Sequence, residues 1–284
     1  MFQFRSIVAS CCFLFAATSF LCSYVVAAET IESPADDQEH SFEGTLRVLS
    51  YNIHHAEGVD GKLDLVRIAN LIKSVRADIV LLQEVDQEVA RSESVDQPTQ
   101  FGALTKMEFA FGKNIPLQGG GYGNAILSRW PIRDIQNHLL PNLENGEQRG
   151  VLSGVIEIGS AELPAIRVLA THFDHRRKDE ERFQSAAKVT EMIIGTTEMP
   201  VLFGGDLNDD AESRTVKRLS ENLVFTNQKP LPTIPVTKPT RQIDFIAYYP
   251  ATAWKVLETT VLDEAIASDH RAILSVLEFQ PNAK

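Results

Sequence analysis

The stretch VLFGGDLNDD, residues 201–210, decides the fold and begins as an apolar strand that needs the interior of a sheet. Two glycines end this strand and allow the backbone to turn sharply or to approach another group closely. Asp206 and Asn208 follow at alternate positions, so on an extended chain their side chains point the same way. A carboxylate and an amide presented together can hold a water or an oxyanion, but a polar turn explains the same residues equally well.

Residues 1–28 predict a secretory signal peptide. Arg5 supplies a short positive region, residues 7–26 form an apolar run, and small residues suitable for cleavage follow. An uncleaved membrane anchor is the main alternative, because the run approaches the ~20 apolar residues that a membrane span needs. Lipid attachment at Cys11 or Cys22 is a third interpretation, although the apolar run before Cys11 is short. We therefore expect a secreted or periplasmic protein.

All three cysteines lie in this segment, so the exported protein has no disulfide, no thiolate metal site and no cysteine catalysis. Cleavage also removes Arg5 but no acidic residue, which changes the formal net charge of −11 by one unit, to −12. An acidic surface argues against tight, non-specific binding to nucleic acid. It leaves room for a local phosphate site, especially one that holds divalent cations.

The remaining chain predicts a linker and one domain. Residues 29–44 are polar and acidic and indicate a flexible linker. Residues 45–280 contain no second linker, repeat or low-complexity tract, so we expect them to form a single domain with an ordinary hydrophobic core. We expect a monomer without an obligate protein partner.

A first strand-helix-strand unit delivers two polar side chains to one edge of the sheet. Residues 45–53 (TLRVLSYNI) predict a strand that ends near Asn52. Asp64 is a suitable N-cap for a helix whose apolar residues recur at helical spacing. Residues 78–82 (DIVLL) predict a buried strand that runs into Glu84. Open α/β sheets place ligands at the carboxyl ends of their strands, where both polar residues lie.

The rest of the chain is rich in strands and poor in helices. Helical spacing predicts a helix over 180–194 and a short one over 213–219, and the polar stretch 223–240 predicts a long loop. Further strands are expected at 109–112, 122–129, 132–140, 149–158, 164–172, 242–248, 254–262 and 272–279. This order favours two packed sheets with helices outside over one parallel, doubly wound sheet.

Polar residues recur at the ends of these predicted strands. They are Asn52, Glu84, His172, Asp206, Asn208, Asp244, Asp269 and His270. Each one alone has a structural explanation, such as a turn, a cap or an exposed acid. Asp244 is the hardest to explain in this way, because it lies between two apolar residues and a buried carboxylate needs a partner. The pair Asp269-His270, just before the last strand, offers that partner.

Together these side chains can hydrolyse a phosphate ester with the help of a metal ion. Carboxylate and amide oxygens without thiols suit Mg²⁺, with Mn²⁺ or Ca²⁺ as alternatives. A histidine oriented by an aspartate can act as general acid or base, or stabilise negative charge. Other hydrolase classes are disfavoured, because the chain contains no G-x-S-x-G, H-E-x-x-H, Walker A or GxGxxG motif.

The sequence resembles the endonuclease/exonuclease/phosphatase superfamily, whose members include deoxyribonuclease I, and most of all its small secreted or periplasmic bacterial members. The matching segments follow the family's order along nearly the whole exported chain. They are LSYNI (49–53), DIVLLQEVD (78–86), GNAILSRWPI (123–132), ATHFDH (170–175), GGDLND (204–209), RQIDFI (241–246) and SDHRAI (268–273). The resemblance implies a four-layer α/β/β/α sandwich of two mixed, mainly antiparallel sheets.

The resemblance also implies a role for each polar residue in a Mg²⁺-dependent phosphoric ester hydrolase. Glu84 would be the principal Mg²⁺ ligand, with Asn52 and Asp269 close to the ion. Asp206 would orient or deprotonate the attacking water, and Asn208 would hold the phosphate or the nucleophile. Asp244 would orient His270, which would stabilise the transition state. His172 matches a second catalytic histidine of deoxyribonuclease-like members.

Three further residues are candidate substrate contacts: Asn124, Arg149 and His55. His55 belongs to a polar cluster with His54, Asp60 and Asp64, which could read the substrate, bind a second metal or cap the following helix. The substrate could be nucleic acid, a phospholipid head group, or a sugar or inositol phosphate. A sphingomyelinase-like lipid phosphodiesterase and a catalytically inactive binding module with the same fold are the alternative functions.

Overall fold

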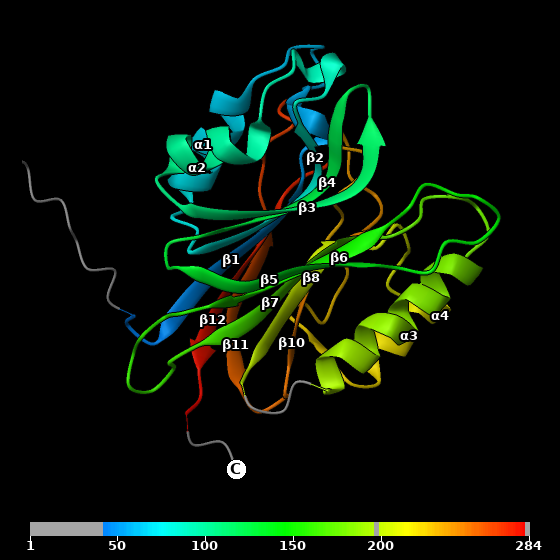
Figure 1. The fold of residues 1–284 in the computed structure, drawn as a ribbon. Coiled ribbons are helices and arrows are strands. Elements are labelled where there is room, and N and C mark those ends of the chain that lie inside the picture. The colour runs from blue at the N-terminus through cyan, green and yellow to red at the C-terminus, as the bar shows by residue number, and fades with distance from the viewer. Residues whose placement is uncertain (1–41, 196–198, 282–284) are drawn as a thin grey trace, which may run out of the picture. The chain divides into compact units, whose positions relative to one another are not determined.

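A computed structural model describes residues 42–195 and 199–281, which form two six-stranded sheets (Figure 1). The predicted signal peptide and most of the predicted linker lie outside the described residues. None of the helices in the described part is long and apolar enough to cross a membrane.

The first sheet joins the beginning and the end of the chain. Its strands are β1 (Thr45–Asn52), β2 (Ile79–Gln87), β3 (Glu108–Leu117), β4 (Gly120–Ser128), β11 (Trp254–Val261) and β12 (Ile273–Phe279). They lie in the order β11-β12-β1-β2-β4-β3. Only the neighbours β1 and β2 run parallel, because the helical connection between them returns the chain to the same edge.

The second sheet comes from the middle of the chain. Its strands are β5 (Ile132–Leu139), β6 (Gly150–Ile156), β7 (Ile166–His172), β8 (Val201–Asp206), β9 (Val224–Phe225) and β10 (Asp244–Tyr249). Their order is β5-β6-β7-β8-β10-β9, and β7 and β8 are its parallel pair. Both sheets are therefore mixed and mainly antiparallel, as predicted.

Three apolar clusters separate four layers. One cluster joins residues of both sheets, among them Leu81 and Leu202, and fills the space between the sheets. A second packs helices α1 (Leu65–Ser74) and α2 (Gln97–Thr105) on the first sheet. A third packs α3 (Glu180–Ile194) and α4 (Arg214–Ser220) on the second. Figure 1 shows the two helix pairs on opposite sides, which confirms the predicted α/β/β/α sandwich.

Two strand predictions needed correction. Strand β3 spans Glu108–Leu117, well beyond the expected 109–112, because it pairs with β4 along nearly its whole length. Its polar residues and Pro116 obscure the strand pattern in the sequence, but a proline is tolerated here because β3 is an edge strand. The predicted loop 223–240 contains the short edge strand β9, which is too brief to leave a periodic pattern.

Strand register brings three of the polar residues side by side. Strand β7 runs parallel to β8 and places His172 opposite Asp206. Strand β10 runs antiparallel to β8, so its first residue, Asp244, lies opposite the last residue of β8 on the other flank. One row across β7, β8 and β10 therefore carries His172, Asp206 and Asp244.

Gly205 is required by the backbone beside this row. Its φ is +150°, and a Cβ atom added there would lie 1.9 Å from the carbonyl oxygen of Thr171 on β7. We expect Gly205→Ala to lower the free energy of unfolding by about 3 kcal/mol, because strain and overpacking act together. Urea denaturation measures this loss.

The control is Gly119→Ala, at a glycine with φ +95° and no atom within 4 Å of the added Cβ. This variant carries the backbone strain without the clash, so it should lose only about 1 kcal/mol. Equal losses in the two variants would contradict a steric requirement at Gly205.

Candidate active site

Three nitrogen atoms converge on one oxygen of Asp206, at the seam between the two sheets. Asn52 Nδ2, from β1 of the first sheet, donates to Asp206 Oδ2 over 3.0 Å. His172 Nε2 and His270 Nε2 lie 3.5 Å and 3.7 Å from the same oxygen. The other oxygen, Oδ1, accepts from the backbone N–H of Asn208 over 2.8 Å. Asp206 is only 1% exposed, so this arrangement is shielded from solvent.

This environment makes Asp206 more basic than a surface aspartate. Burial raises the pKa of its carboxyl group, and the negative charge of Asp244 raises it further. His270 and the hydrogen bond from Asn52 act in the opposite direction without cancelling the rise. A carboxylate with a raised pKa can accept a proton from water near neutral pH.

His270 is held as a cation by the neighbouring carboxylates. Its Nδ1 lies 2.9 Å from Oδ2 of Asp244, and Thr233 Oγ1 donates to the same oxygen. Burial lowers the pKa of His270, but the charges of Asp244 and Asp206 outweigh burial and raise it. Ser268 positions the turn, since its Oγ donates to Asn52 O and accepts from the backbone N–H of His270. The imidazolium thus presents Nε2–H towards Asp206.

His172 has a different environment. Its Nδ1 lies 3.1 Å from Nη1 of the buried Arg149, and its Nε2 lies 2.9 Å from Nδ2 of Asn208. Burial and the positive charge of Arg149 hold the pKa of His172 well below its usual value, with smaller contributions from the other histidines. His172 is therefore neutral, whereas His270 is charged.

Glu84 reaches the same place from β2. Asn52 Nδ2 donates to Glu84 Oε1 over 3.0 Å, and Asn52 Oδ1 accepts from the backbone N–H of His54. Glu84 has a φ of +60° at a register shift between β2 and β4. His54, His55 and Ala56 also have positive φ, of 46°, 43° and 66°. Strained non-glycine backbone of this kind concentrates at functional sites.

Two groups of donors fit a divalent cation. In the described part of the chain, no lysine or arginine lies within ion-pair distance of the half-buried Glu84 or the exposed Asp269. Asn52 connects them, since its Nδ2 donates to Glu84 Oε1 and its backbone oxygen accepts from Ser268 Oγ, which lies 3.3 Å from Asp269 Oδ1. Carboxylate and amide oxygens are hard ligands of the kind that Mg²⁺ prefers. The second group is Asp206, Asp244 and His270, whose ligand atoms lie within 4.8 Å of one another.

We favour the first group, because the second has internal partners. His270 Nδ1 lies 2.9 Å from Asp244 Oδ2, Thr233 Oγ1 donates to the same oxygen, and Asn52 Nδ2 donates to Asp206 Oδ2. Placing the cation near Glu84 also leaves Asp206 available as a base.

The three candidate substrate contacts lie in different environments. Asn124 on β4 is fully buried, donates to Gly150 O over 3.1 Å, and keeps an Oδ1 without a partner among the described residues. Arg149 contacts two histidines rather than open space. His55 is buried, and its Nε2 lies 3.4 Å from Oε2 of Glu57. Among the residues that the structure describes, it forms no hydrogen bond or ion pair with Asp206.

The remaining acids of the polar cluster after β1 have structural partners. Asp64 caps α1, as predicted, because its Oδ1 accepts from the backbone N–H of Arg67. Asp60 forms a two-pronged ion pair with the Arg67 guanidinium. These contacts favour the capping interpretation of the acids over a second metal site.

Sequence reasoning missed two residues that touch this centre. Thr233 lies in the Pro-rich loop before β10 and offers no pattern that would link it to Asp244. His175 follows His172 in the segment ATHFDH, and that spacing was the available signal for it. Its Nδ1 lies 3.1 Å from Nη2 of Arg149.

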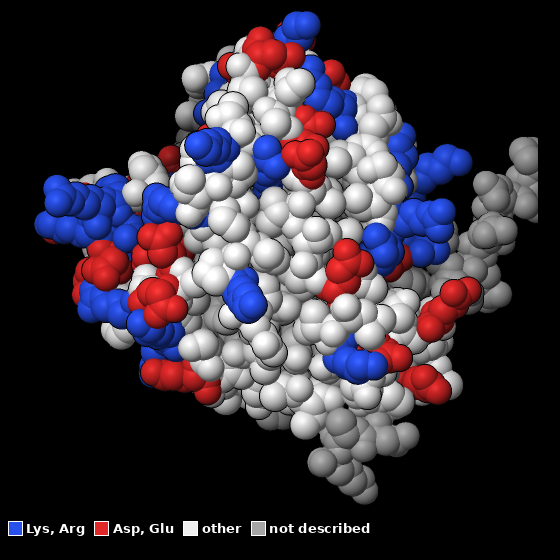
Figure 2. Space-filling model, turned by 180° about the vertical axis from the view of Figure 1, so that it is seen from behind, with Lys and Arg blue, Asp and Glu red and all other residues white. Residues whose placement is uncertain are grey.

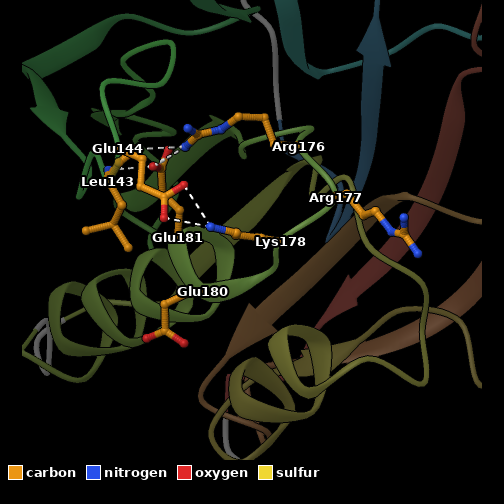
Figure 3. Close-up of a pocket in the computed structure, with 7 residues that line it drawn as sticks. All are labelled: Leu143, Glu144, Arg176, Arg177, Lys178, Glu180 and Glu181. Atoms are coloured by element: carbon orange, nitrogen blue, oxygen red, sulfur yellow. Dashed lines mark hydrogen bonds and ion pairs between the residues drawn. The ribbon is translucent and has the colours of Figure 1, made fainter.

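A cavity of about 490 Å³ lies between the β5–β6 connection and the start of α3 (Figure 3). Most of its charged side chains are paired. Lys178 binds Glu144, and Arg176 binds Asp174 and Glu181, whereas Arg177 points away from the others in Figure 3. The cavity thus has mixed charge.

The reverse face of the molecule has mixed charge as well. In Figure 2 its described acidic and basic side chains alternate around a mostly uncharged centre. Binding a nucleic-acid backbone needs several phosphate contacts from a continuous basic tract, which this face does not offer.

Comparisons with known proteins agree with this geometry. The sequence model of the Endonuclease/Exonuclease/phosphatase family matches residues 49–270. The Escherichia coli K12 protein YbhP is 31% identical over 235 residues, which cover 78% of this chain and 89% of YbhP.

Solved structures share the fold. An endonuclease/exonuclease/phosphatase from Beutenbergia cavernae superposes with a TM-score of 0.71 and 25% identity, covering 83% of this chain and 72% of that one. The mannosyl-6-phosphatase Bt3783 of Bacteroides thetaiotaomicron superposes with a TM-score of 0.69 and 20% identity, covering 82% of this chain and 100% of that one.

Proposed function

The chain belongs to the endonuclease/exonuclease/phosphatase family, and we propose that it is a divalent-metal-dependent hydrolase of phosphoric esters that works outside the cytoplasm. The family consists of phosphoesterases and nucleases that depend on divalent metals, so membership supports the hydrolase class. The observation that carries the finer proposal is the convergence of Asn52, His172 and His270 on Asp206 Oδ2. This arrangement combines one basic carboxylate with N–H donors suited to a negatively charged group.

Each residue of the site then has a chemical task. Asp206 Oδ2 takes a proton from the attacking water, whose oxygen forms the new bond to phosphorus. The leaving oxygen departs with the electron pair of the broken P–O bond. The Nε2–H groups of His270 and His172 face the region where the phosphoryl oxygens gain negative charge, and preorganised donors of this kind stabilise a transition state.

Glu84, Asn52 and Asp269 would hold the metal ion, which supplies Lewis-acid stabilisation of phosphoryl charge when it is bound. Asn52 also links this group to the base, because its amide nitrogen donates to both Glu84 and Asp206. Glu84, as a proposed metal ligand, and Asp206, as the proposed base, are therefore held by the same amide.

An activity assay with two synthetic esters tests the proposal. We expect hydrolysis of p-nitrophenyl phosphate, a monoester, or bis-p-nitrophenyl phosphate, a diester, in the presence of Mg²⁺ or Mn²⁺. EDTA should abolish it, and added metal should restore it. Equal rates with and without EDTA, or folded protein that hydrolyses neither ester under any of these cations, would contradict the proposal.

The same assay with a panel of phosphate esters identifies the substrate class. The panel contains duplex DNA, sphingomyelin vesicles, sugar phosphates and inositol phosphates, each with Mg²⁺. The net charge of −11 and the mixed charge of the reverse face favour a small phosphate ester over long duplex DNA. Preferential cleavage of DNA at physiological salt would overturn this ranking.

We also propose export through residues 1–28, on the strength of the positive residue, apolar run and small residues described above. Mass spectrometry of the protein recovered outside the cytoplasm should show an N-terminus close to Glu29. Recovery of the uncleaved chain in the membrane fraction would instead support an anchor.

A further inference from the structure

Arg149 lies between two histidines beside the site. Its Nη1 lies 3.1 Å from His172 Nδ1, and its Nη2 lies 3.1 Å from His175 Nδ1. Glu147 Oε1 lies 2.8 Å from Nη1, and the arginine is only 3% exposed. Its Nε is buried and has no hydrogen-bond partner among the described residues. Both ends of the guanidinium are thus already engaged by the protein.

The chemistry of arginine decides the protonation of both rings. A guanidinium stays charged in proteins and can only donate hydrogen bonds. The nitrogen that faces it must therefore carry a lone pair, so His172 Nδ1 and His175 Nδ1 are unprotonated. A neutral imidazole keeps one proton, which must then reside on Nε2. Arg149 thereby specifies the same tautomer in both histidines.

The Nε2–H of His172 lacks a good acceptor in the structure. Asn208 Nδ2 lies 2.9 Å away, but this atom also donates to the carbonyl oxygen of Phe173 over 3.1 Å, which identifies it as the amide nitrogen. The Asn208 amide thus favours a lone pair on Nε2, whereas the charged guanidinium of Arg149, which can only donate, requires the lone pair on Nδ1 and leaves the proton on Nε2. Asp206 Oδ2 lies 3.5 Å from Nε2. An N–H in this position is available to a further acceptor beside the catalytic carboxylate.

We propose that Arg149 is a positioning residue that fixes His172 with its proton on Nε2, so that His172 donates a hydrogen bond to the phosphoryl group and does not act as a base. The donor role of His172 towards the phosphoryl group rests on the proposed function, whereas the position of its ring proton does not. It assigns Arg149 an indirect role in place of the direct phosphate contact expected from the sequence. The low pKa of His172 agrees with a neutral ring.

Nuclear magnetic resonance of ¹⁵N-labelled histidine tests the tautomer without any substrate. Two-bond ¹H–¹⁵N correlations distinguish a ring protonated on Nε2 from one protonated on Nδ1. Signals of His172 and His175 are assigned by their disappearance in His172→Gln and His175→Gln. We expect Nε2–H for both rings in the wild-type protein.

Two variants of Arg149 separate positioning from other roles. In Arg149→Met, the Asn208 amide can donate to His172 Nε2, so the proton of His172 should move to Nδ1. The kcat should fall about 100-fold, as for the loss of one preorganised donor, with a smaller change in KM. In Arg149→Lys, the ammonium can still donate to Nδ1, so His172 should keep Nε2–H and recover most of kcat. Circular dichroism confirms that both variants are folded.

Three results would overturn the proposal. A His172 protonated on Nδ1 in the wild-type protein contradicts the structural argument, and an unchanged tautomer in folded Arg149→Met contradicts the role of Arg149. A shifted tautomer with unchanged kcat contradicts the donor role of His172. If no phosphate ester is hydrolysed at all, the proposed function fails, but the resonance measurement still decides whether Arg149 fixes the tautomer.

Discussion

Replacing His270 by alanine is expected to lower kcat/KM for phosphate-ester hydrolysis about 10³-fold, one of the two largest effects that the structure predicts. The imidazolium is a charged donor close to Asp206, with 3.7 Å between Nε2 and Oδ2. Its Nδ1 is held by Asp244 at 2.9 Å, which fixes the direction of the Nε2–H bond. Its removal takes away both the positive charge and the oriented donor. Steady-state kinetics with bis-p-nitrophenyl phosphate and Mg²⁺ measure the loss.

The same substitution leaves two buried carboxylates without their cation. Asp206 and Asp244 are 1% and 0% exposed, and losing one partner of a buried ion pair costs about 3–5 kcal/mol. His270→Ala is therefore accompanied by His270→Gln, whose side-chain amide can still donate to Asp244. The glutamine variant should recover stability in urea denaturation without recovering activity. Recovery of activity as well would show that the charge of His270 is dispensable.

His138→Ala serves as the matched control. This histidine is half-buried on β5, which β6 and β7 separate from the strand that carries Asp206. The kcat/KM of the His138→Ala variant should match that of the wild-type protein. Equal losses in the His138 and His270 variants would indicate a general effect of histidine removal, and wild-type activity in folded His270→Ala would refute the assignment.

The strand ends of the site could be predicted because apolar runs stop there abruptly. Asn52 and Asp206 are the last residues of β1 and β8, and Asp244 is the first residue of β10. A polar residue directly after a buried strand, or an acid inside an apolar run, is visible without knowledge of the fold. The ordered family segments then supplied the two-sheet architecture, which periodicity alone would not have distinguished from other arrangements of strands.

The partners within the site could not be predicted, because they depend on sheet order and register. Arg149 meets His172 only because β6 and β7 pair antiparallel with Val151 opposite Thr171. Thr233 reaches Asp244 because its loop folds back on Arg241, whose carbonyl oxygen accepts a hydrogen bond from the Thr233 N–H. Neither pairing leaves a pattern in the sequence, and so the sequence predicts a direct phosphate contact for Arg149.

The consequence is a site with two histidines in opposite states. His270 faces Asp244 through Nδ1 and is charged, whereas His172 faces Arg149 through Nδ1 and is neutral. The same side chain can thus supply an ionic donor on one side of Asp206 and a neutral donor on the other. Neighbouring charges, and not residue type, determine these roles.

Glu84→Gln is expected to remove divalent-metal binding and to lower kcat/KM about 10³-fold at subsaturating Mg²⁺, which corresponds to roughly 4 kcal/mol of transition-state stabilisation. The glutamine has the same shape and can still accept the hydrogen bond from Asn52 Nδ2, but it lacks the negative charge that attracts the cation. Calorimetric titration with Mn²⁺ measures binding directly, and excess metal should restore part of the activity. Glu88→Gln, at an exposed position just after β2, is the control and should bind Mn²⁺ normally.

Comparison with Asp206→Asn locates the cation. If Glu84 and Asn52 hold the ion, Asp206→Asn should retain Mn²⁺ binding while losing the base that accepts the water proton. If the ion instead lies among Asp206, Asp244 and His270, Asp206→Asn should lose Mn²⁺ binding and Glu84→Gln should keep it. The second outcome would also conflict with a protonated His270, because its Nε2 would have to release its proton to solvent before it could bind the metal. The pair of titrations therefore tests the metal position and the charge of His270 together.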